Sequence, residues 1–275
     1  MRIDAHQHYW LYNAQRDTWI TEDMEIIRRN FLPTDISTTL KEKGIDGVVA
    51  VQADQSAAET QFLLDLSTMY ALIKGIVGWV DLQASDIETQ LQAYKAYPRL
   101  KGFRHIVEGE EDPDFLMRPD FLKGISALTK HGYTYDLLIH PRHYASTLAC
   151  VAANPEQRFM LDHMAKPAIK EGKWKEWADF IEELAEFPNV FCKVSGLATE
   201  ADWKGWKSTD FTPYVAHAIQ CFGKGRILFG SDWPVCILAA SYEESLSLVQ
   251  AQLADFSANE LAAFWGGNAT RFYNL

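Results

Sequence analysis

Short apolar runs alternate with longer amphipathic segments from one end of the chain to the other. Eight short runs are present, and they end at Ala5, Gln52, Asp81, His105, His140, His163, Ser195 and Asp232. Nine longer segments carry apolar residues at helical spacing, over residues 34–43, 57–73, 85–97, 119–131, 143–153, 174–187, 212–222, 241–256 and 258–265. Because strands that alternate with helices form parallel sheets, this pattern predicts an α/β protein.

The number of strand–helix repeats favours one closed barrel. A (β/α)8 barrel needs about 250 residues, which is most of this 275-residue chain. A doubly wound open sheet, the main alternative, usually carries a glycine-rich phosphate loop after its first strand. Here the first run ends in His-Gln-His, and no GxGxxG motif occurs. We therefore predict a single (β/α)8 TIM-like barrel domain over residues 1–275.

Local signals mark several of the predicted helix boundaries. Gly44, Gly132 and Gly223 follow helical segments and precede apolar runs, where a left-handed C-cap glycine is typical. Ser85 and Glu88 have the spacing of a capping box. The sequence thus predicts helix ends near these three glycines and a helix start near Ser85.

Composition and charge exclude several classes of partner. The formal net charge is −11 and no basic run occurs, whereas nucleic-acid binding requires clustered Lys and Arg. No apolar run approaches the ~20 residues of a membrane span, and the N-terminus has no signal-peptide pattern. Four widely spaced cysteines without a CxxC pair favour free thiols in a reducing compartment. We expect a cytoplasmic protein that binds neither nucleic acid nor membrane, and these patterns leave its oligomeric state open.

Ionisable side chains end most of the predicted strands, and a parallel barrel carries its active site at the carboxyl ends of its strands. His6 and His8 lie two residues apart in the first strand, so both imidazoles face the same side. Two such imidazoles suit one divalent metal ion, although exposed histidines on a frayed strand are the simpler alternative. Asp232 ends the last strand, beside the first in a closed barrel, although a turn or helix-capping aspartate would also fit. Together with His163 of the sixth strand, these residues form the candidate catalytic and metal-binding cluster.

Other residues at the strand ends are candidates for binding the hydroxyl groups of a small substrate. These are Gln52, Arg104, His105, His140, Arg142 and Trp233. The planar guanidinium of Arg104 suits hydroxyl groups or a carboxylate, but a structural pair with a carboxylate such as Asp81 is an equal alternative. Trp233 is a candidate for stacking on a sugar ring. The tryptophan-rich segment over residues 203–206 suggests a loop packed over the barrel mouth.

Motifs along the whole chain resemble the amidohydrolase superfamily, and more narrowly its sugar-lactonase branch, the L-fuconolactone and L-rhamnonolactone hydrolases. They are, in order, DAHQHYW, KGFRH, DLLIHPRH, LDHMAKP, CKVSGL and LFGSDWPV. The resemblance assigns catalytic roles to His6, His8, His163 and Asp232, with Asp232 as the acid/base. It implies substrate contacts for Arg104 and His105.

The resemblance also implies a cofactor and a reaction. Many members of the superfamily hold two metal ions with a carboxylated lysine on strand four or five, and no lysine ends those strands here. At most one divalent, zinc-like ion is therefore implied, on His6, His8, His163 and Asp232, with catalysis without metal as the alternative. The implied reaction is hydrolysis of a small sugar-acid lactone to the free aldonate, with the metal ion or a histidine cluster polarising the carbonyl. A metal-dependent decarboxylase or hydratase of the same superfamily is the alternative activity.

Overall fold

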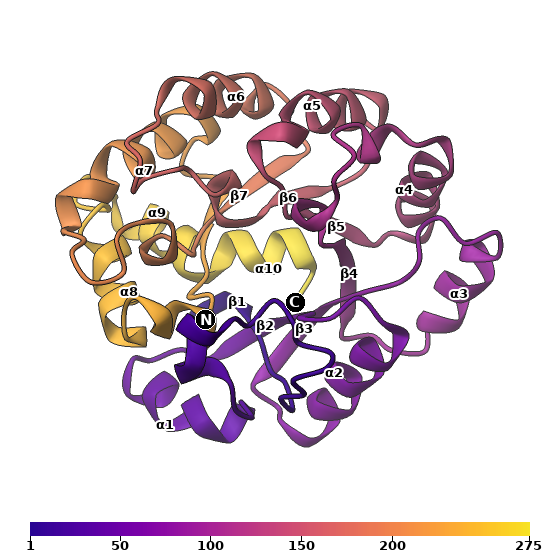
Figure 1. Ribbon diagram of the computed structural model, residues 1–275, viewed down its shortest axis with the longest axis horizontal. Helices are drawn as coiled ribbons and strands as arrows, with labels where there is room; N and C mark the ends of the chain where they lie inside the picture. The colour runs from indigo at the N-terminus through magenta and orange to yellow at the C-terminus, as the bar shows by residue number, and fades with distance from the viewer.

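The computed structural model describes all 275 residues and contains one parallel sheet whose eight strands follow chain order. The strands are β1 (Ile3–Gln7), β2 (Gly47–Val51), β3 (Ile73–Gly78), β4 (Leu100–His105), β5 (Thr134–Leu137), β6 (Phe159–Leu161), β7 (Val190–Val194) and β8 (Ile227–Phe229). The amide of His8 donates to the carbonyl of Trp233 at 2.7 Å, and the amide of Asp232 donates to the carbonyl of His6 at 2.9 Å. The chain after β8 thus meets β1, and this closure confirms the predicted (β/α)8 barrel (Figure 1).

Helices surround the barrel, and each strand is followed by one of them (Figure 1). They are α1 (Pro33–Glu42), α2 (Ala57–Met69), α3 (Ile87–Tyr94), α4 (Pro119–His131), α5 (Tyr144–Ala153), α6 (Lys175–Ala185), α7 (Ser208–Phe222) and α8 (Tyr242–Gln250). Two further helices, α9 (Ala258–Ala262) and α10 (Asn268–Tyr273), end the chain. None of the helices combines the length and the apolarity that a membrane crossing requires.

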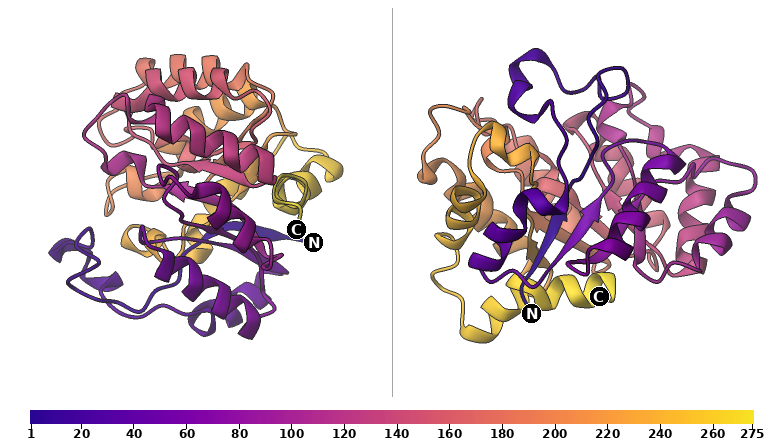
Figure 2. Two further views of the ribbon diagram at one scale, coloured as in Figure 1. Left: turned by 90° about the vertical axis from the view of Figure 1, so that its right-hand side faces the viewer. Right: turned by 90° about the horizontal axis from the view of Figure 1, so that it is seen from below.

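The last helix, α10, closes the end of the barrel at which the strands begin. Figure 2 shows it below the strands, beside the N-terminus. Phe272 and Tyr273 of this helix join Val49, Val77 and Met160 of the barrel in one buried apolar cluster. Because apolar packing seals this end, a functional site has to lie at the opposite end, where the strands finish.

Several predicted boundaries differ from the observed ones. The helix expected over residues 57–73 ends at Met69, because Ile73 is the first residue of β3 and pairs with Val48 of β2. Strand β5 ends at Leu137, so His140 lies three residues beyond the sheet. The segment expected to be one helix over residues 241–256 ends its helix at Gln250. Apolar spacing alone does not separate a helix end from the strand or turn that follows it.

The helix ends predicted at three glycines are confirmed, and the capping box predicted at Ser85 is wrong. Gly44, Gly132 and Gly223 have φ of +66°, +73° and +68°, the left-handed backbone that terminates a helix. Ser85 forms no cap, because α3 begins one residue later than the box requires, at Ile87. Instead, Glu88 accepts a hydrogen bond from Lys130 of α4 at 2.9 Å. Glu88 therefore contacts the neighbouring helix α4 and not the backbone at the start of its own helix.

Glu59 of α2 is a buried acid whose ionisation links stability to pH. Its Oε1 accepts a hydrogen bond from the amide of Ala53 at 3.0 Å, while burial raises its pKa from 4.5 to about 7. The folded protein thus holds a proton that the unfolded chain releases between pH 4.5 and pH 7. The free energy of unfolding therefore falls as the pH rises through this window, by about 3 kcal/mol at most.

We expect Glu59→Gln to raise the melting temperature at pH 8 by about 3–8 °C and to leave it nearly unchanged at pH 4.5. Glutamine keeps the hydrogen-bond acceptor but carries no charge to bury. Thermal unfolding followed by circular dichroism at both pH values measures the difference. Glu156→Gln, in an exposed loop, is the matched control, and an equal shift of Glu59→Gln at both pH values would contradict the linkage.

Candidate active site

The carboxyl ends of β1, β6 and β8 bring His6, His8, His163 and Asp232 together. His6 Nε2 lies 3.1 Å from His8 Nε2, and His8 Nε2 lies 3.3 Å from Asp232 Oδ1. The Nε2 atoms of His6 and His163 lie 3.7 and 3.9 Å from the same carboxylate oxygen. No side chain of the four is more than 7% exposed. Three imidazoles thus converge on one buried carboxylate at the mouth of the barrel.

Interactions within this cluster keep Asp232 ionised. Burial by itself would raise the pKa of Asp232, but His163, His8 and His6 outweigh it and lower that pKa below its ordinary value. Burial is also the main cause that lowers the pKa of His163 to about 4 and the pKa of His6 well below its ordinary value. At neutral pH, Asp232 is therefore a carboxylate and His6 and His163 are neutral imidazoles, the protonation states that bind a metal ion.

The side chains of His6, His8 and Asp232 also have the spacing that one small divalent ion requires. Their donor atoms are 3.1, 3.3 and 3.7 Å apart, close to the ~3.3 Å between tetrahedral ligands at zinc bond lengths of ~2.0–2.1 Å. His8 Nδ1 lies 2.8 Å from the carbonyl of Val51, a contact that typically fixes the ring of a metal-binding histidine. His163 lies at the edge of this group, with its Nδ1 2.9 Å from Ser195 Oγ. The residues therefore fit a single ion.

Beneath the histidines, the barrel interior holds four charged groups, of which only Arg104 was a candidate in the sequence analysis. Lys193 Nζ lies 2.6 Å from Asp136 Oδ2 and 2.9 Å from Asp162 Oδ1, and all three side chains are fully buried. Arg104 donates from Nη1 to Asp162 Oδ2 at 3.0 Å. Asp162 Oδ1 in turn lies 3.5 Å from His6 Nδ1. Two cations and two carboxylates thus support the histidine cluster from below.

The backbone after β6 is strained where it carries part of the site. The four residues over 163–166 all have φ between +49° and +58°, and a left-handed conformation costs about 1–2 kcal/mol per L-residue. The turn packs His163 against Gly196, where an added Cβ would come within 2.7 Å of the ring. It also allows Asp162 and His163, neighbours in the chain, both to reach the centre of the barrel. Strain of this kind is typical of functional sites.

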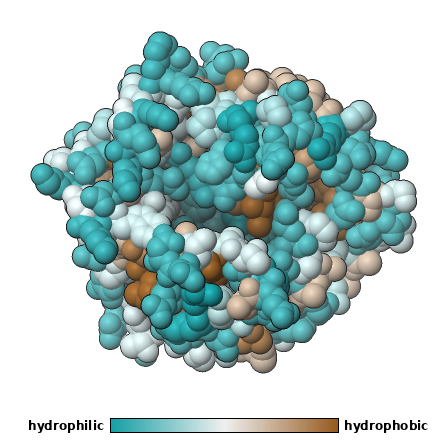
Figure 3. Space-filling model, in the orientation of Figure 1, coloured by the Kyte–Doolittle hydropathy of each residue, from teal (hydrophilic) through white to brown (hydrophobic).

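A cavity of about 380 Å³ opens above the cluster, where the surface is hollowed near the middle of the face in Figure 3. His8, Arg104, His163 and Asp232 line it, and the volume lies within the range of small-molecule sites. Apolar side chains that include Trp19, Met24 and Leu238 form part of the wall. Trp203 also lines the cavity, which agrees with the expected loop over the barrel mouth.

Among the six candidate substrate-binding residues, only Arg104 reaches the cavity. Its guanidinium pairs with a buried structural carboxylate, as the alternative expected, but the partner is Asp162 and not Asp81. The side-chain amide of Gln52 is buried and donates to the carbonyl of Arg104 at 3.1 Å. Trp233 is buried in the aromatic core and does not line the cavity. Gln52 and Trp233 therefore act as support behind the site, because their side chains are already packed.

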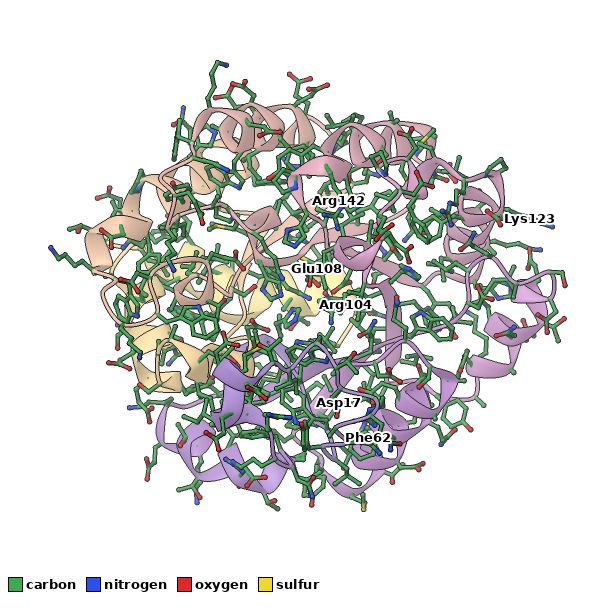
Figure 4. The ribbon with its side chains drawn as sticks, viewed as in Figure 1. Asp17, Phe62, Arg104, Glu108, Lys123 and Arg142 are labelled. Carbon is green, nitrogen blue, oxygen red and sulfur yellow. The ribbon has the colours of Figure 1, made fainter.

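His105, His140 and Arg142 do not line the cavity either. His105 follows Arg104 on a strand and therefore faces the other side, where its Nε2 lies 2.7 Å from Glu110 Oε1. Arg142 donates to the carbonyl of Glu110 at 3.0 Å, and Figure 4 shows it farther from the barrel axis than Arg104. His140 lies beyond β5 with its side chain 41% exposed. These three side chains thus lie outside the cavity lining, and their contact with a substrate stays a prediction.

Three charged residues that the sequence analysis did not select do line the cavity. Glu108, Lys166 and Glu200 come from the segments that follow β4, β6 and β7. Lys166 Nζ lies 2.5 Å from Glu108 Oε2. Lys166 belongs to the LDHMAKP motif, so its distance of three residues from His163 was an available signal. Glu108 and Glu200 lie in 3₁₀ segments of three residues, which are too short for a periodic pattern to indicate the direction of a side chain.

A closed (β/α)8 barrel with histidines and an aspartate at its strand ends defines a hydrolase of the amidohydrolase type. The family model described as amidohydrolase matches residues 3–275, and the chain belongs to this family.

Two curated relatives and one solved structure resemble the whole chain. An L-fucono-1,5-lactonase of Burkholderia multivorans is 38% identical over 290 residues, which cover 100% of this chain and 96% of that protein. An L-fucono-1,5-lactonase of Burkholderia ambifaria is 34% identical over 281 residues, with the same two coverages. The crystal structure of a Burkholderia multivorans amidohydrolase with bound zinc is 38% identical in sequence and has a TM-score of 0.96. The match covers 100% of this chain and 99% of that chain.

Proposed function

We propose that this protein hydrolyses a neutral sugar-acid lactone, L-fucono-1,5-lactone or a close analogue, to the free aldonate. The observation that carries this proposal is the ionised Asp232, surrounded by three histidines at the floor of a cavity large enough for one sugar ring. The lactonases of the two Burkholderia species, which resemble the chain over its full length, support the choice of substrate class.

Asp232 is suited to both proton transfers of the reaction. Its carboxylate accepts a proton from the water that attacks the lactone carbonyl, which is general base catalysis. The protonated Asp232 then returns this proton to the leaving ring oxygen, a step that its lowered pKa favours, while the same lowering makes it a weaker base in the first step. The guanidinium of Arg104 is held in place by Asp162 and by the carbonyl of Gln52, at 3.0 and 2.6 Å. It presents a fixed positive charge to the negative charge that develops on the carbonyl oxygen.

His6, His8 and Asp232 would hold one divalent ion, and the zinc in the related Burkholderia structure makes zinc the first candidate. Such an ion supplies Lewis-acid polarisation of the carbonyl. Asp232 would be one of the three ligands of this ion, and its carboxylate would also handle the proton. His163 lies at the edge of the same group, where its Nε2 would donate or accept a hydrogen bond.

The alternative activity, a metal-dependent decarboxylase or hydratase, needs a cation that receives the carboxylate of its substrate. Both cations that line the cavity, Arg104 and Lys166, already have carboxylate partners, Asp162 and Glu108. The cavity wall combines apolar side chains with cations that are already paired, so it suits a neutral ring better than an anionic one. We therefore place lactone hydrolysis first.

Proton release from L-fucono-1,5-lactone, measured with a pH indicator, tests the proposal before and after removal of metal. We expect turnover by the purified enzyme, a loss of at least about 100-fold after chelation, and recovery with one equivalent of Zn²⁺ per chain. Metal analysis of each sample is the control. Full turnover by metal-free protein would assign carbonyl polarisation to Arg104 and His163 instead. No turnover in any metal state would overturn the lactonase proposal.

A further inference from the structure

The charged residues that line the cavity carry more negative than positive charge. Glu108 and Glu200 add two carboxylates to that of Asp232. Of the two cations, Lys166 lies 2.5 Å from Glu108 and Arg104 lies 3.0 Å from Asp162. Each cation thus has a carboxylate partner, whereas no cation lies within ion-pair distance of Glu200, so acidic side chains outnumber the cations on the cavity wall.

Glu200 is the carboxylate that remains without a partner in the protein. It ends a short 3₁₀ segment after β7, Ala198–Glu200, where its backbone carbonyl accepts a hydrogen bond from Lys170 and its side chain forms none. Burial raises the pKa of Glu200 to about 7, and the charges of Glu108 and Asp232 add to this effect against that of Lys166. Glu200 is therefore a buried acid without an ion-pair partner, beside two other carboxylates in the wall of the cavity.

Lys166 offsets part of this charge through its pair with Glu108. It is the last residue of the left-handed turn over residues 163–166, and its φ is +49°. Its side chain is 21% exposed, as is that of Glu108, with which it pairs. The pair thus forms a polar part of the cavity wall, and Glu200 adds a further carboxylate to it.

We propose that Glu200 and Glu108 determine substrate specificity: they accept hydrogen bonds from the hydroxyl groups of a neutral sugar lactone and exclude lactones that carry a carboxylate. At pH 8, above the pKa of Glu200 at about 7, both side chains are carboxylates, which only accept hydrogen bonds, and sugar hydroxyl groups are the donors that match them. A carboxylate on the substrate would instead face acids in a partly desolvated cavity, where like charges repel strongly. This inference rests on the proposed lactone hydrolysis and assigns two residues to it.

Three lactones that differ at one carbon test the charge selection. L-fucono-1,5-lactone carries a methyl group at C6, L-galactono-1,5-lactone a hydroxymethyl group, and the corresponding galactarolactone a carboxylate. We expect kcat/KM for the two neutral lactones to agree within about 10-fold and that for the galactarolactone to be at least about 100-fold lower. Equal kcat/KM for the galactarolactone and L-galactono-1,5-lactone would overturn the inference.

Glu200→Gln separates the role of this residue from that of the cavity as a whole. The amide keeps an acceptor and removes the charge, so we expect KM for the neutral lactones to rise while kcat/KM for the galactarolactone rises about 10-fold. The ratio of the two specificities thus moves toward one, which a merely destabilising change would not cause. Glu156→Gln, an equal loss of charge on an exposed loop, should leave the ratio unchanged. An unchanged ratio in Glu200→Gln would remove Glu200 from the proposal.

Failure of the inference and failure of the proposed function are distinguishable. If wild-type protein hydrolyses no neutral lactone, lactone hydrolysis itself is wrong. Calorimetric titration of the wild-type protein with L-galactose and with L-galacturonate then still compares a neutral with an anionic ring. Tighter binding of the neutral sugar supports the charge selection, and equal or tighter binding of the uronate overturns it.

Discussion

Asp232→Asn is expected to lower kcat for lactone hydrolysis by about 10²–10⁴-fold, the range typical of a lost general acid–base group. Asparagine keeps the size of the side chain but neither accepts the proton of the attacking water nor returns it. The backbone at this position has φ of +62°, a conformation that Asn adopts as readily as Asp. The loss would therefore arise from the carboxylate and not from a distorted turn.

Steady-state kinetics with L-fucono-1,5-lactone measure this effect, and thermal unfolding shows that the variant is folded. Asp65→Asn, on the exposed face of α2, is the matched control and should retain full activity. If Asp232→Asn keeps more than about a tenth of the wild-type kcat, the proposed acid–base role of Asp232 is wrong.

Lys193→Met is expected to destabilise the protein by about 3–5 kcal/mol, because it leaves buried carboxylates without their cation. Lys193 Nζ lies 2.6 Å from Asp136 and 2.9 Å from Asp162, with no solvent exposure. A loss of this size is a large part of the 5–15 kcal/mol that typically separates folded from unfolded protein. Urea unfolding of wild type and variant measures it.

The same variant should be less destabilised at pH 5 than at pH 8. Burial already raises the pKa of Asp136 to about 6, and removal of the ammonium group raises it further. The folded variant then takes up a proton that the unfolded chain does not hold, so its stability falls as the pH rises. Lys175→Met, which breaks an exposed pair with Asp179, should cost less than about 1 kcal/mol. A pH-independent loss in Lys193→Met would contradict the role of the buried carboxylates.

The barrel itself could be predicted because its signals are local. Apolar spacing distinguishes strands from helices over a few residues, and glycines such as Gly132 mark helix ends through their own backbone freedom. Parallel order and closure then place the carboxyl ends of all strands at one end. His6, His8 and Asp232 came together in the prediction for this reason, although they lie at opposite ends of the chain.

Side chains beyond the strand ends could not be placed in the same way. His105 faces away from the cavity because it follows Arg104 on a strand, and Arg142 binds a loop carbonyl that no pattern indicated. Regular alternation after Met160 directs Asp162 into the barrel interior, and the left-handed turn that begins at His163 breaks this alternation, so His163 reaches the centre as well. Loops without periodicity thus decided which polar residues face the ligand.

The sequence by itself determined the strand and helix order, the closed barrel, and the end of the barrel at which His6, His8, His163 and Asp232 meet, because each follows from local periodicity and chain connectivity. Only the tertiary structure decided the pairing of Lys193 with Asp136 and the approach of Glu200 to the cavity. Burying a charge is unfavourable unless a partner lies within a few ångströms. Such partners come from distant segments, and their distances exist only in the folded chain.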